Sequence, residues 1–277
     1  MNALLKLIEL PYCGLNRLRR ALYRHGVLKP RRLPRPVISI GNIAAGGAGK
    51  TPAVIALAQF LAERGHRVAV LTRGYGRSGR GGAVDALDPA RFGDEPVVIK
   101  KRCENVDVIV GVNRYQNASA IICDVYILDD GFQHLQLARD LDIGIDVPHA
   151  PFHREGRSAL RDADFVIPRQ IRLADPGLVR GKRLFAFAGL AGNEQFFATL
   201  REAGATVAGS LGFPDHHPYS AADLQSIRRA AALAGAEVIV TTEKDAVKVQ
   251  QADMIAVPIE FILPAEVLDR AAALVAK

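Results

Sequence analysis

A glycine-rich turn between an apolar run and a helical segment constrains this fold most. Residues 37–40 form a short β-rich run, and residues 41–49 contain four glycines that allow a tight turn. Residues 51–64 then carry apolar side chains at helical spacing, and residues 68–71 are the next β-rich run. A strand, a loop, a helix and a second strand in this order are typical of a parallel α/β sheet.

The turn itself has the chemistry of a phosphate-binding loop. Glycines there let backbone N–H groups turn inward onto phosphate oxygens, and the helix that follows adds the positive end of its dipole. Lys50 is expected to contact the β- and γ-phosphates of ATP, and the Thr51 hydroxyl to bind Mg²⁺. The usual first glycine falls at Ala44, so the loop is not a strict match. The alternative is a structural turn with an incidental lysine. The predicted nucleotide-binding residues are Gly46, Gly47, Ala48, Gly49, Lys50 and Thr51.

Such a loop needs an acidic partner for its metal ion. Residues 125–128 are an apolar run that ends in Asp129 and Asp130, as expected for a strand that presents carboxylates to Mg²⁺. Apolar strands followed by acids are common in α/β proteins. The assignment therefore depends on the phosphate-binding loop.

Three other clusters have both a chemical and a structural interpretation. Arg73 and Tyr75 follow a predicted strand, where ligands bind in open α/β sheets, but they also fit a solvated glycine turn. Residues 93–96 contain two acids at a predicted helix start, where acids are favoured as simple caps. Residues 213–218 place two histidines beside an aspartate between prolines, and these histidines are either chemical or structural.

The remaining pattern predicts a two-domain α/β protein, although a chain of 277 residues can also form one large domain. Prolines and glycines cluster at residues 168–183. We therefore expect a P-loop NTPase-type parallel-sheet domain over residues 1–168 and a second, smaller α/β domain over residues 169–277. Further predicted strands are 108–110, 125–128, 143–145, 165–167, 184–188, 238–240 and 259–263, and further predicted helices are 193–203, 221–234 and a final one from Ala265.

Positive charge is concentrated in the first 36 residues. The chain has a net charge of +7, and this segment alone holds nine basic residues against Glu9. Leu15, Leu18 and Leu22 recur at helical spacing, with arginines off that stripe. An apolar stripe with an arginine flank favours a membrane interface over a DNA groove. The alternative is a helix packed on its own domain with a solvated basic face.

Composition indicates a cytosolic protein. No apolar run is long enough to span a bilayer, and Lys6 and Glu9 interrupt the only N-terminal candidate for a signal peptide. The three cysteines, Cys13, Cys103 and Cys123, lack metal-type spacing and are expected to be reduced thiols.

Taken together, these motifs resemble the tetraacyldisaccharide 4'-kinases, also called lipid A 4'-kinases, over nearly the whole chain. The resemblance implies an ATP- and Mg²⁺-dependent kinase that phosphorylates the 4'-hydroxyl of a tetraacyl glucosamine disaccharide 1-phosphate. It also implies a peripheral protein on the cytoplasmic face of the inner membrane. The motifs that carry it are Gly46-Gly47-Ala48-Gly49-Lys50-Thr51, Arg73-Gly74-Tyr75-Gly76, Gly93-Asp94-Glu95-Pro96, Leu128-Asp129-Asp130-Gly131-Phe132-Gln133-His134, Phe213-Pro214-Asp215-His216-His217-Pro218 and Thr242-Glu243-Lys244-Asp245.

The same resemblance assigns roles to individual residues. Asp94 would be the general base, assisted by His216 from the second domain. A hydroxyl acceptor needs a positioned carboxylate to take its proton, which agrees with this assignment. Residues implied on the substrate side are Arg73, Tyr75, Arg114, His134 and Arg154, and those implied in the metal region are Thr51, Glu95, Asp129 and Asp130.

One departure concerns the substrate. Family members carry a longer glycine-rich loop where this chain has only residues 146–152, and the segment between Gln116 and Val125 also looks shortened. The Arg154-Glu155 pair survives after this loop. These differences leave room for a variant disaccharide substrate.

Two other functional classes stay open at this stage. A P-loop GTPase switch would need an Asn-Lys-x-Asp motif, which the chain lacks. A nucleic-acid-dependent ATPase would show basic residues interleaved with aromatics and steep salt dependence. The chain has no such pattern and no tryptophan, so we expect that it does not bind nucleic acid. We also expect a monomer.

Overall fold

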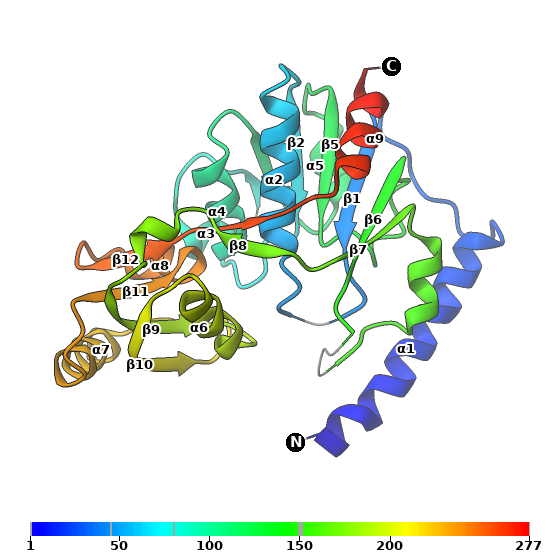
Figure 1. Cartoon of the computed structure of the whole chain (residues 1–277). Coiled ribbons are helices and arrows are strands. Elements are labelled where there is room, and N and C mark those ends of the chain that lie inside the picture. The colour runs from blue at the N-terminus through cyan, green and yellow to red at the C-terminus, as the bar shows by residue number, and fades with distance from the viewer. Residues whose placement is uncertain (1, 45, 80, 149–151, 277) are drawn as a thin grey trace.

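The computed structural model describes residues 2–44, 46–79, 81–148 and 152–276, with side chains described from Pro11 onward. Within these ranges the chain forms a seven-stranded sheet, a four-stranded sheet and a two-stranded ribbon (Figure 1). We call the first two the larger and the smaller sheet. The predicted α/β class is confirmed.

The larger sheet is parallel except at one edge. Its order is β3-β4-β2-β5-β1-β6-β7, and only the β3–β4 pair is antiparallel. The phosphate-loop strand β1 therefore lies between β5 and β6, and Ile40 is level with Asp129. The strands are β1 (Val37–Gly41), β2 (Val68–Thr72), β3 (Gly82–Ala83), β4 (Asp107–Val110), β5 (Val125–Asp129), β6 (Leu141–Asp146) and β7 (Phe165–Pro168).

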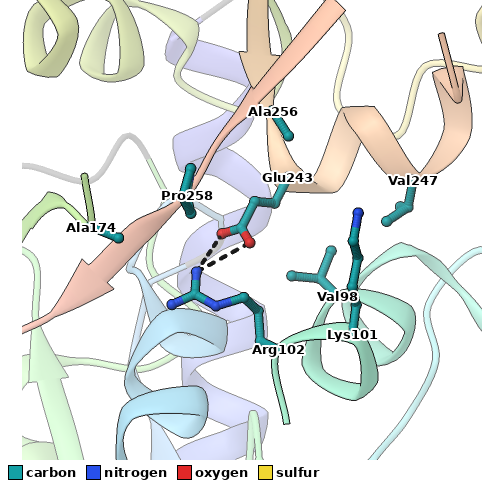
Figure 2. Close-up of a pocket in the computed structure, with 8 residues that line it drawn as sticks. All are labelled: Val98, Lys101, Arg102, Ala174, Glu243, Val247, Ala256 and Pro258. Carbon is teal, nitrogen blue, oxygen red and sulfur yellow. Dashed lines mark hydrogen bonds and ion pairs between the residues drawn. The ribbon is translucent and has the colours of Figure 1, made fainter. Parts of the chain in front are cut away.

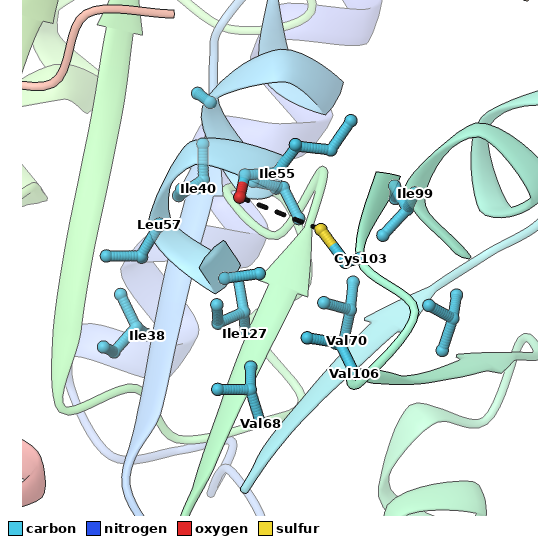
Figure 3. Close-up of a cluster of buried hydrophobic side chains, with 14 of the residues drawn as sticks. Ile38, Ile40, Ile55, Leu57, Val68, Val70, Ile99, Cys103, Val106 and Ile127 are labelled. Atoms are coloured by element: carbon cyan, nitrogen blue, oxygen red, sulfur yellow. Dashed lines mark hydrogen bonds between the residues drawn. The ribbon is translucent and has the colours of Figure 1, made fainter. Parts of the chain in front are cut away.

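Helices cover both faces of the larger sheet. On one face α2 (Lys50–Ala62), α4 (Asp94–Arg102) and α9 (Ala265–Val275) pack on strand side chains such as Ile38 and Ile127, which are fully buried (Figure 3). The other face buries Tyr126 and Leu128 near α5 (Arg114–Ala118). Each fully buried aliphatic side chain contributes about 1.5–3 kcal/mol, so this core holds the strand ends in fixed relative positions.

The smaller sheet is parallel throughout, in the order β10-β9-β11-β12. The helices α6 (Asn193–Glu202) and α7 (Ala221–Leu233) belong to separate apolar clusters on its two faces. Strands β10 and β12 were not expected from the sequence. The strands are β9 (Arg183–Gly189), β10 (Thr206–Phe213), β11 (Val238–Thr242) and β12 (Met254–Val257), and α8 (Glu243–Val249) follows β11.

Two antiparallel strands connect the sheets. The chain leaves the larger sheet through β8 (Ile171–Leu173) and returns through β13 (Ile259–Phe261). Helix α9 then packs with the core of the larger sheet, through Val267 and Ala271. The domain division at residue 168 stays a prediction, but the last residues of the range 169–277 pack on the larger sheet and not on the smaller one.

The N-terminal helix α1 (Asn2–Arg24) lies at the side of the larger sheet away from the smaller one (Figure 1). Its leucine stripe faces outward, because Leu15 and Leu18 are 64% and 58% exposed. The protein-facing side is polar: Arg20 is buried and pairs with Glu155 at 2.8 Å. The predicted alternative was a helix packed on its own domain with a solvated basic face. The helix does pack on the protein through Arg20, but Leu15 and Leu18 face outward.

Shorter elements complete the fold. They are α3 (Pro89–Phe92) and the 3-10 helices η1 (Arg157–Asp162) and η2 (Pro176–Leu178). Among the described residues, no helix is both long enough and apolar enough to cross a membrane. Residues 149–151 of the shortened 146–152 loop lie outside the described residues.

Candidate active site

The phosphate loop forms as its glycines predict. Gly46, Gly47 and Gly49 have φ values of 75°, 61° and 75°, in the left-handed region that glycine adopts most easily. Helix α2 begins at Lys50, one residue before the predicted start. The loop thus joins the carboxyl end of β1 directly to a helix N-terminus, the arrangement that binds phosphate.

Lys50, which directly follows this loop, contacts two polar side chains. Its Nζ donates a hydrogen bond to Oδ1 of Asn42 at 3.2 Å and lies 3.6 Å from Oδ1 of Asp130. Asn42 is fully buried next to β1. The lysine is therefore held between Asn42 and Asp130, which follows β5. From this place it could contact both the phosphates and a nearby metal ion.

Asp130 is bound from two sides. Arg154 donates to both of its carboxylate oxygens, at 2.8 and 2.7 Å, and also donates to Oδ1 of Asn42 at 2.8 Å. Burial opposes ionisation of Asp130, but the hydrogen bonds from Arg154 and the charge of Lys50 outweigh it and hold its pKa well below the usual range. Arg154, expected on the substrate side, thus lies against the predicted metal ligand Asp130.

Asp129 is deeper than its neighbour. Thr72, at the end of the adjacent β2, donates to its Oδ2 at 2.9 Å. Burial and the neighbouring charge of Asp130 raise the pKa of Asp129 to about 6. A cation would relieve this crowding of two carboxylates, so the site fits a hard, oxygen-binding metal such as Mg²⁺.

Two further predicted residues surround these acids. Arg114 is buried and donates to the backbone carbonyl of Asp130 at 3.4 Å. Burial, together with the charge of Arg114, lowers the pKa of His134 to about 4, so its ring is neutral at physiological pH. Their assignment to the substrate side stays a prediction.

Glu95 stands apart from the acids of β5. Its Oε1 lies 3.0 Å from Nζ of Lys244, which belongs to α8. Within the described part of the chain, no three histidine, cysteine, aspartate or glutamate residues form a metal-binding group. The role of Glu95 as a metal ligand therefore stays a prediction.

A second cluster forms around Asp94, the first residue of α4. The preceding Gly93 has a φ of 96°, and a Cβ there would lie 2.8 Å from the carbonyl oxygen of Tyr75, so glycine permits this close helix start. Nδ1 of His216 lies 3.0 Å from Oδ2 of Asp94. The Tyr75 ring lies 5.0 Å from the His216 ring, between centroids.

The pKa values of Asp94 and His216 are shifted in opposite directions. Burial raises the pKa of Asp94, but the His216 hydrogen bond and the charges of Lys248 and Lys244 exceed this effect, and the net pKa is lowered. The hydrogen bond to Asp94 raises the pKa of His216. The carboxylate is therefore ionised and able to accept a proton.

Arg73 follows β2 directly. Its side chain is exposed at the end of β2, and its backbone carbonyl accepts a hydrogen bond from Arg77. An exposed arginine beside the site remains free to hold an anionic group. This position agrees with the expectation from the sequence.

Four polar residues of the site received no predicted role. Asn42, Thr72 and Lys244 lie at a strand end or a helix start, which is the only sequence feature that points to them, whereas Lys248 lies near the end of α8. Lys244 shows their importance, since its Nζ contacts Asp215 at 2.7 Å and Nε2 of His216 at 3.1 Å. The four residues are Asn42, Thr72, Lys244 and Lys248.

A phosphate loop on β1, paired acids on β5 and a buried carboxylate–histidine pair define a P-loop phosphotransferase. The chain belongs to the tetraacyldisaccharide-1-P 4'-kinase family, whose model matches residues 1–177 and 158–275. The family predicted from the sequence is thereby confirmed.

Individual relatives agree with this assignment. A tetraacyldisaccharide 4'-kinase of Anaeromyxobacter sp. (strain K) is 39% identical over 310 residues, covering 91% of this chain and 82% of the relative. One from Geobacter metallireducens is 37% identical over 300 residues, covering 89% and 88%. The crystal structure of LpxK from Aquifex aeolicus in complex with ATP superposes with a TM-score of 0.79 at 28% identity, covering 99% of both chains.

Proposed function

We propose that this enzyme transfers the γ-phosphate of ATP to the 4'-hydroxyl of a tetraacyldisaccharide 1-phosphate, a step of lipid A biosynthesis. The observation that carries the proposal is the 3.0 Å contact between Asp94 and His216, in a chain that also holds Lys50 on a phosphate loop. The choice of acceptor in this proposal rests on the family to which the chain belongs.

The chemistry follows from the charge of Asp94. Its carboxylate takes the proton of the 4'-hydroxyl as the oxygen bonds to the γ-phosphorus, and the bond from that phosphorus to the β–γ bridging oxygen breaks. ADP leaves with the electron pair of that bond. His216 holds the carboxylate by a hydrogen bond while the proton arrives.

Charge on the phosphates is offset by groups of the larger sheet. Lys50 contacts the β- and γ-phosphates, and the loop N–H groups at residues 46–51 bind their oxygens. Thr51, Asp129 and Asp130 would hold Mg²⁺, with Glu95 as a further candidate. Mg²⁺, when bound, neutralises the phosphate oxygens and orients them.

The acceptor approaches from the side of Tyr75. Its ring is 68% exposed beside His216, and the exposed Arg73 lies two residues before it. Stacking on an exposed ring suits a sugar, and a free guanidinium suits the 1-phosphate. Arg114 and His134 are the other residues proposed to line the acceptor region.

Helix α1 is proposed to hold the enzyme on the cytoplasmic face of the inner membrane. Leu15 and Leu18 face outward, while Arg20 and Asn16 fasten the opposite side to residues 154–155. An outward apolar stripe with flanking arginines binds an anionic lipid surface. An acylated substrate would then reach the site without leaving the bilayer.

A matched pair of acceptors tests the proposal. The enzyme is given ATP with either tetraacyldisaccharide 1-phosphate or its 4'-deoxy analogue in detergent micelles. We expect phosphate transfer to the first and none to the second. Equal transfer to both would place the phosphate elsewhere on the acceptor and contradict the proposal.

A further inference from the structure

We propose that Lys248 is a positioning residue for the catalytic carboxylate: it fixes Oδ2 of Asp94, so that Oδ1 is presented to the acceptor hydroxyl. This inference rests on the proposed role of Asp94 as the base. It concerns a residue of α8, on the smaller sheet, that acts on a residue of α4, on the larger one.

Lys248 is surrounded by oxygen atoms. Its Nζ donates a hydrogen bond to the carbonyl of His217 at 3.1 Å, and lies 3.1 Å from Oδ1 of Asp245 and 3.4 Å from Oδ2 of Asp94. The side chain is only 11% exposed. An ammonium group held by three oxygens in this way has little freedom to move.

The anchor of Lys248 is itself rigid. Asp245 is fully buried, and its Oδ2 accepts hydrogen bonds from the backbone N–H of Gly189 at 2.9 Å and from the Thr242 hydroxyl at 2.7 Å. Gly189 ends β9 and Thr242 ends β11, so the central strands of the smaller sheet set the position of this carboxylate. The smaller sheet therefore fixes Asp245, and Asp245 in turn holds Lys248 next to Asp94.

The closest contacts of Asp94 converge on one oxygen, Oδ2. His216 and Lys248 both contact Oδ2, at 3.0 and 3.4 Å. Among the described residues, no side-chain hydrogen bond involves Oδ1. Two contacts on one oxygen fix the rotation of the carboxylate, and misplacing a reacting atom by about 1 Å can cost about 100-fold in rate.

A second ion pair joins the same two helices at their other ends. Arg102 of α4 contacts both carboxylate oxygens of Glu243 of α8, at 3.1 and 3.0 Å. Figure 2 shows this pair in a pocket of about 270 Å³ that Val98 and Val247 also line. It supports the contact between the helices without touching Asp94, and so provides a matched control.

The test compares kcat and KM of the full-length enzyme for ATP and tetraacyldisaccharide 1-phosphate. We expect Lys248→Met to lower kcat by about 10- to 100-fold with KM for ATP unchanged, and Lys248→Arg to recover part of the loss. Glu243→Gln should keep kcat near the native value. Lys248→Gln, which retains an amide donor but no charge, is measured beside them and replaces the methionine variant if that variant does not fold.

A double variant separates positioning from a merely structural role. In an Asp94→Asn background, Lys248→Met should cause no further loss of kcat, because its effect passes through the missing carboxylate. An equal further loss there, or a native kcat in Lys248→Met, would overturn the inference alone. Absence of transfer by the native enzyme would overturn the proposed function and this inference together.

Discussion

Nδ1 of His216 lies 3.0 Å from Oδ2 of Asp94, although 122 positions separate them and they belong to units built on different sheets. His216 reaches this place from a loop in which its own φ is 59°, an uncommon value for a residue other than glycine. In the proposed mechanism the larger sheet supplies the phosphate loop and the base, and the smaller sheet supplies the groups that hold the base. Catalysis would then depend on contact between the two.

Replacing the base should separate chemistry from nucleotide binding. Asp94→Asn removes the proton acceptor but keeps the shape, so we expect kcat to fall by about 100- to 10,000-fold. ATP affinity, measured by titration, should stay within a few-fold, because Asp94 is not part of the phosphate loop. Native turnover in this variant would remove Asp94 as the base.

Loss of the loop lysine should abolish transfer without unfolding the protein. Lys50 contacts Asn42 and Asp130 from a partly open position, so Lys50→Ala leaves no large cavity. We expect no detectable transfer, with a circular dichroism spectrum and a thermal midpoint close to native. A variant that still transfers phosphate would contradict the assignment of the loop.

The attachment of α1 should depend on one buried ion pair. Arg20 and Glu155 have side chains only 7% and 4% exposed, so Arg20→Met leaves a buried carboxylate without its partner. We expect the free energy of unfolding in urea to fall by about 3–5 kcal/mol. Arg24→Met is the control, because Arg24 is 59% exposed in its pair with Asp162 and should cost at most about 1 kcal/mol.

The double variant Arg20→Met/Glu155→Met should recover much of the loss, since neither charge is then buried alone. Equal destabilisation by the Arg20 and Arg24 variants would show that burial of the first pair has no special effect.

The outward leucines of α1 should govern binding to lipid. Leu15→Ser with Leu18→Ser removes apolar area from the exposed stripe, and we expect binding to anionic phospholipid vesicles to weaken at least about tenfold. Leu233→Ser is the matched control, since Leu233 is 85% exposed on α7. Equal weakening by the control, or none by the α1 variant, would contradict membrane attachment through α1.

Local patterns in the sequence predicted the strands of the larger sheet except β3, which has only two residues at its edge. Strands such as β1, β2 and β5 are fully buried runs, and the glycines before Lys50 require the turn that the structure shows. Strand β10 was harder to predict from the sequence, because it lies at an edge of the smaller sheet. Its residues are only partly buried, and buried and exposed positions alternate weakly along it. The return of α9 to the larger sheet depends on the β8–β13 pairing, which no local pattern encodes.

Site residues could be proposed from the sequence where they follow a strand end. They could not be proposed where their place in the site depends on long-range packing. Asp129 was proposed from its position at a strand end. The role of Asp94 came from the family resemblance, because two acids at a helix start also fit simple capping. Lys248 looked like an ordinary lysine on a short helix, and only the packing of α8 against α4 brings it 3.4 Å from Asp94. The place of Arg154 near substrate stays a prediction, and its two hydrogen bonds to Asp130 were not indicated by any pattern in the sequence.

The most direct test follows the label of γ-labelled ATP through the native enzyme. With tetraacyldisaccharide 1-phosphate in detergent micelles and Mg²⁺ present, we expect label to enter the lipid as ADP appears, in equal amounts. Release of the label only as free phosphate, with no labelled lipid, would contradict the claim that this chain is a 4'-kinase of the lipid A precursor.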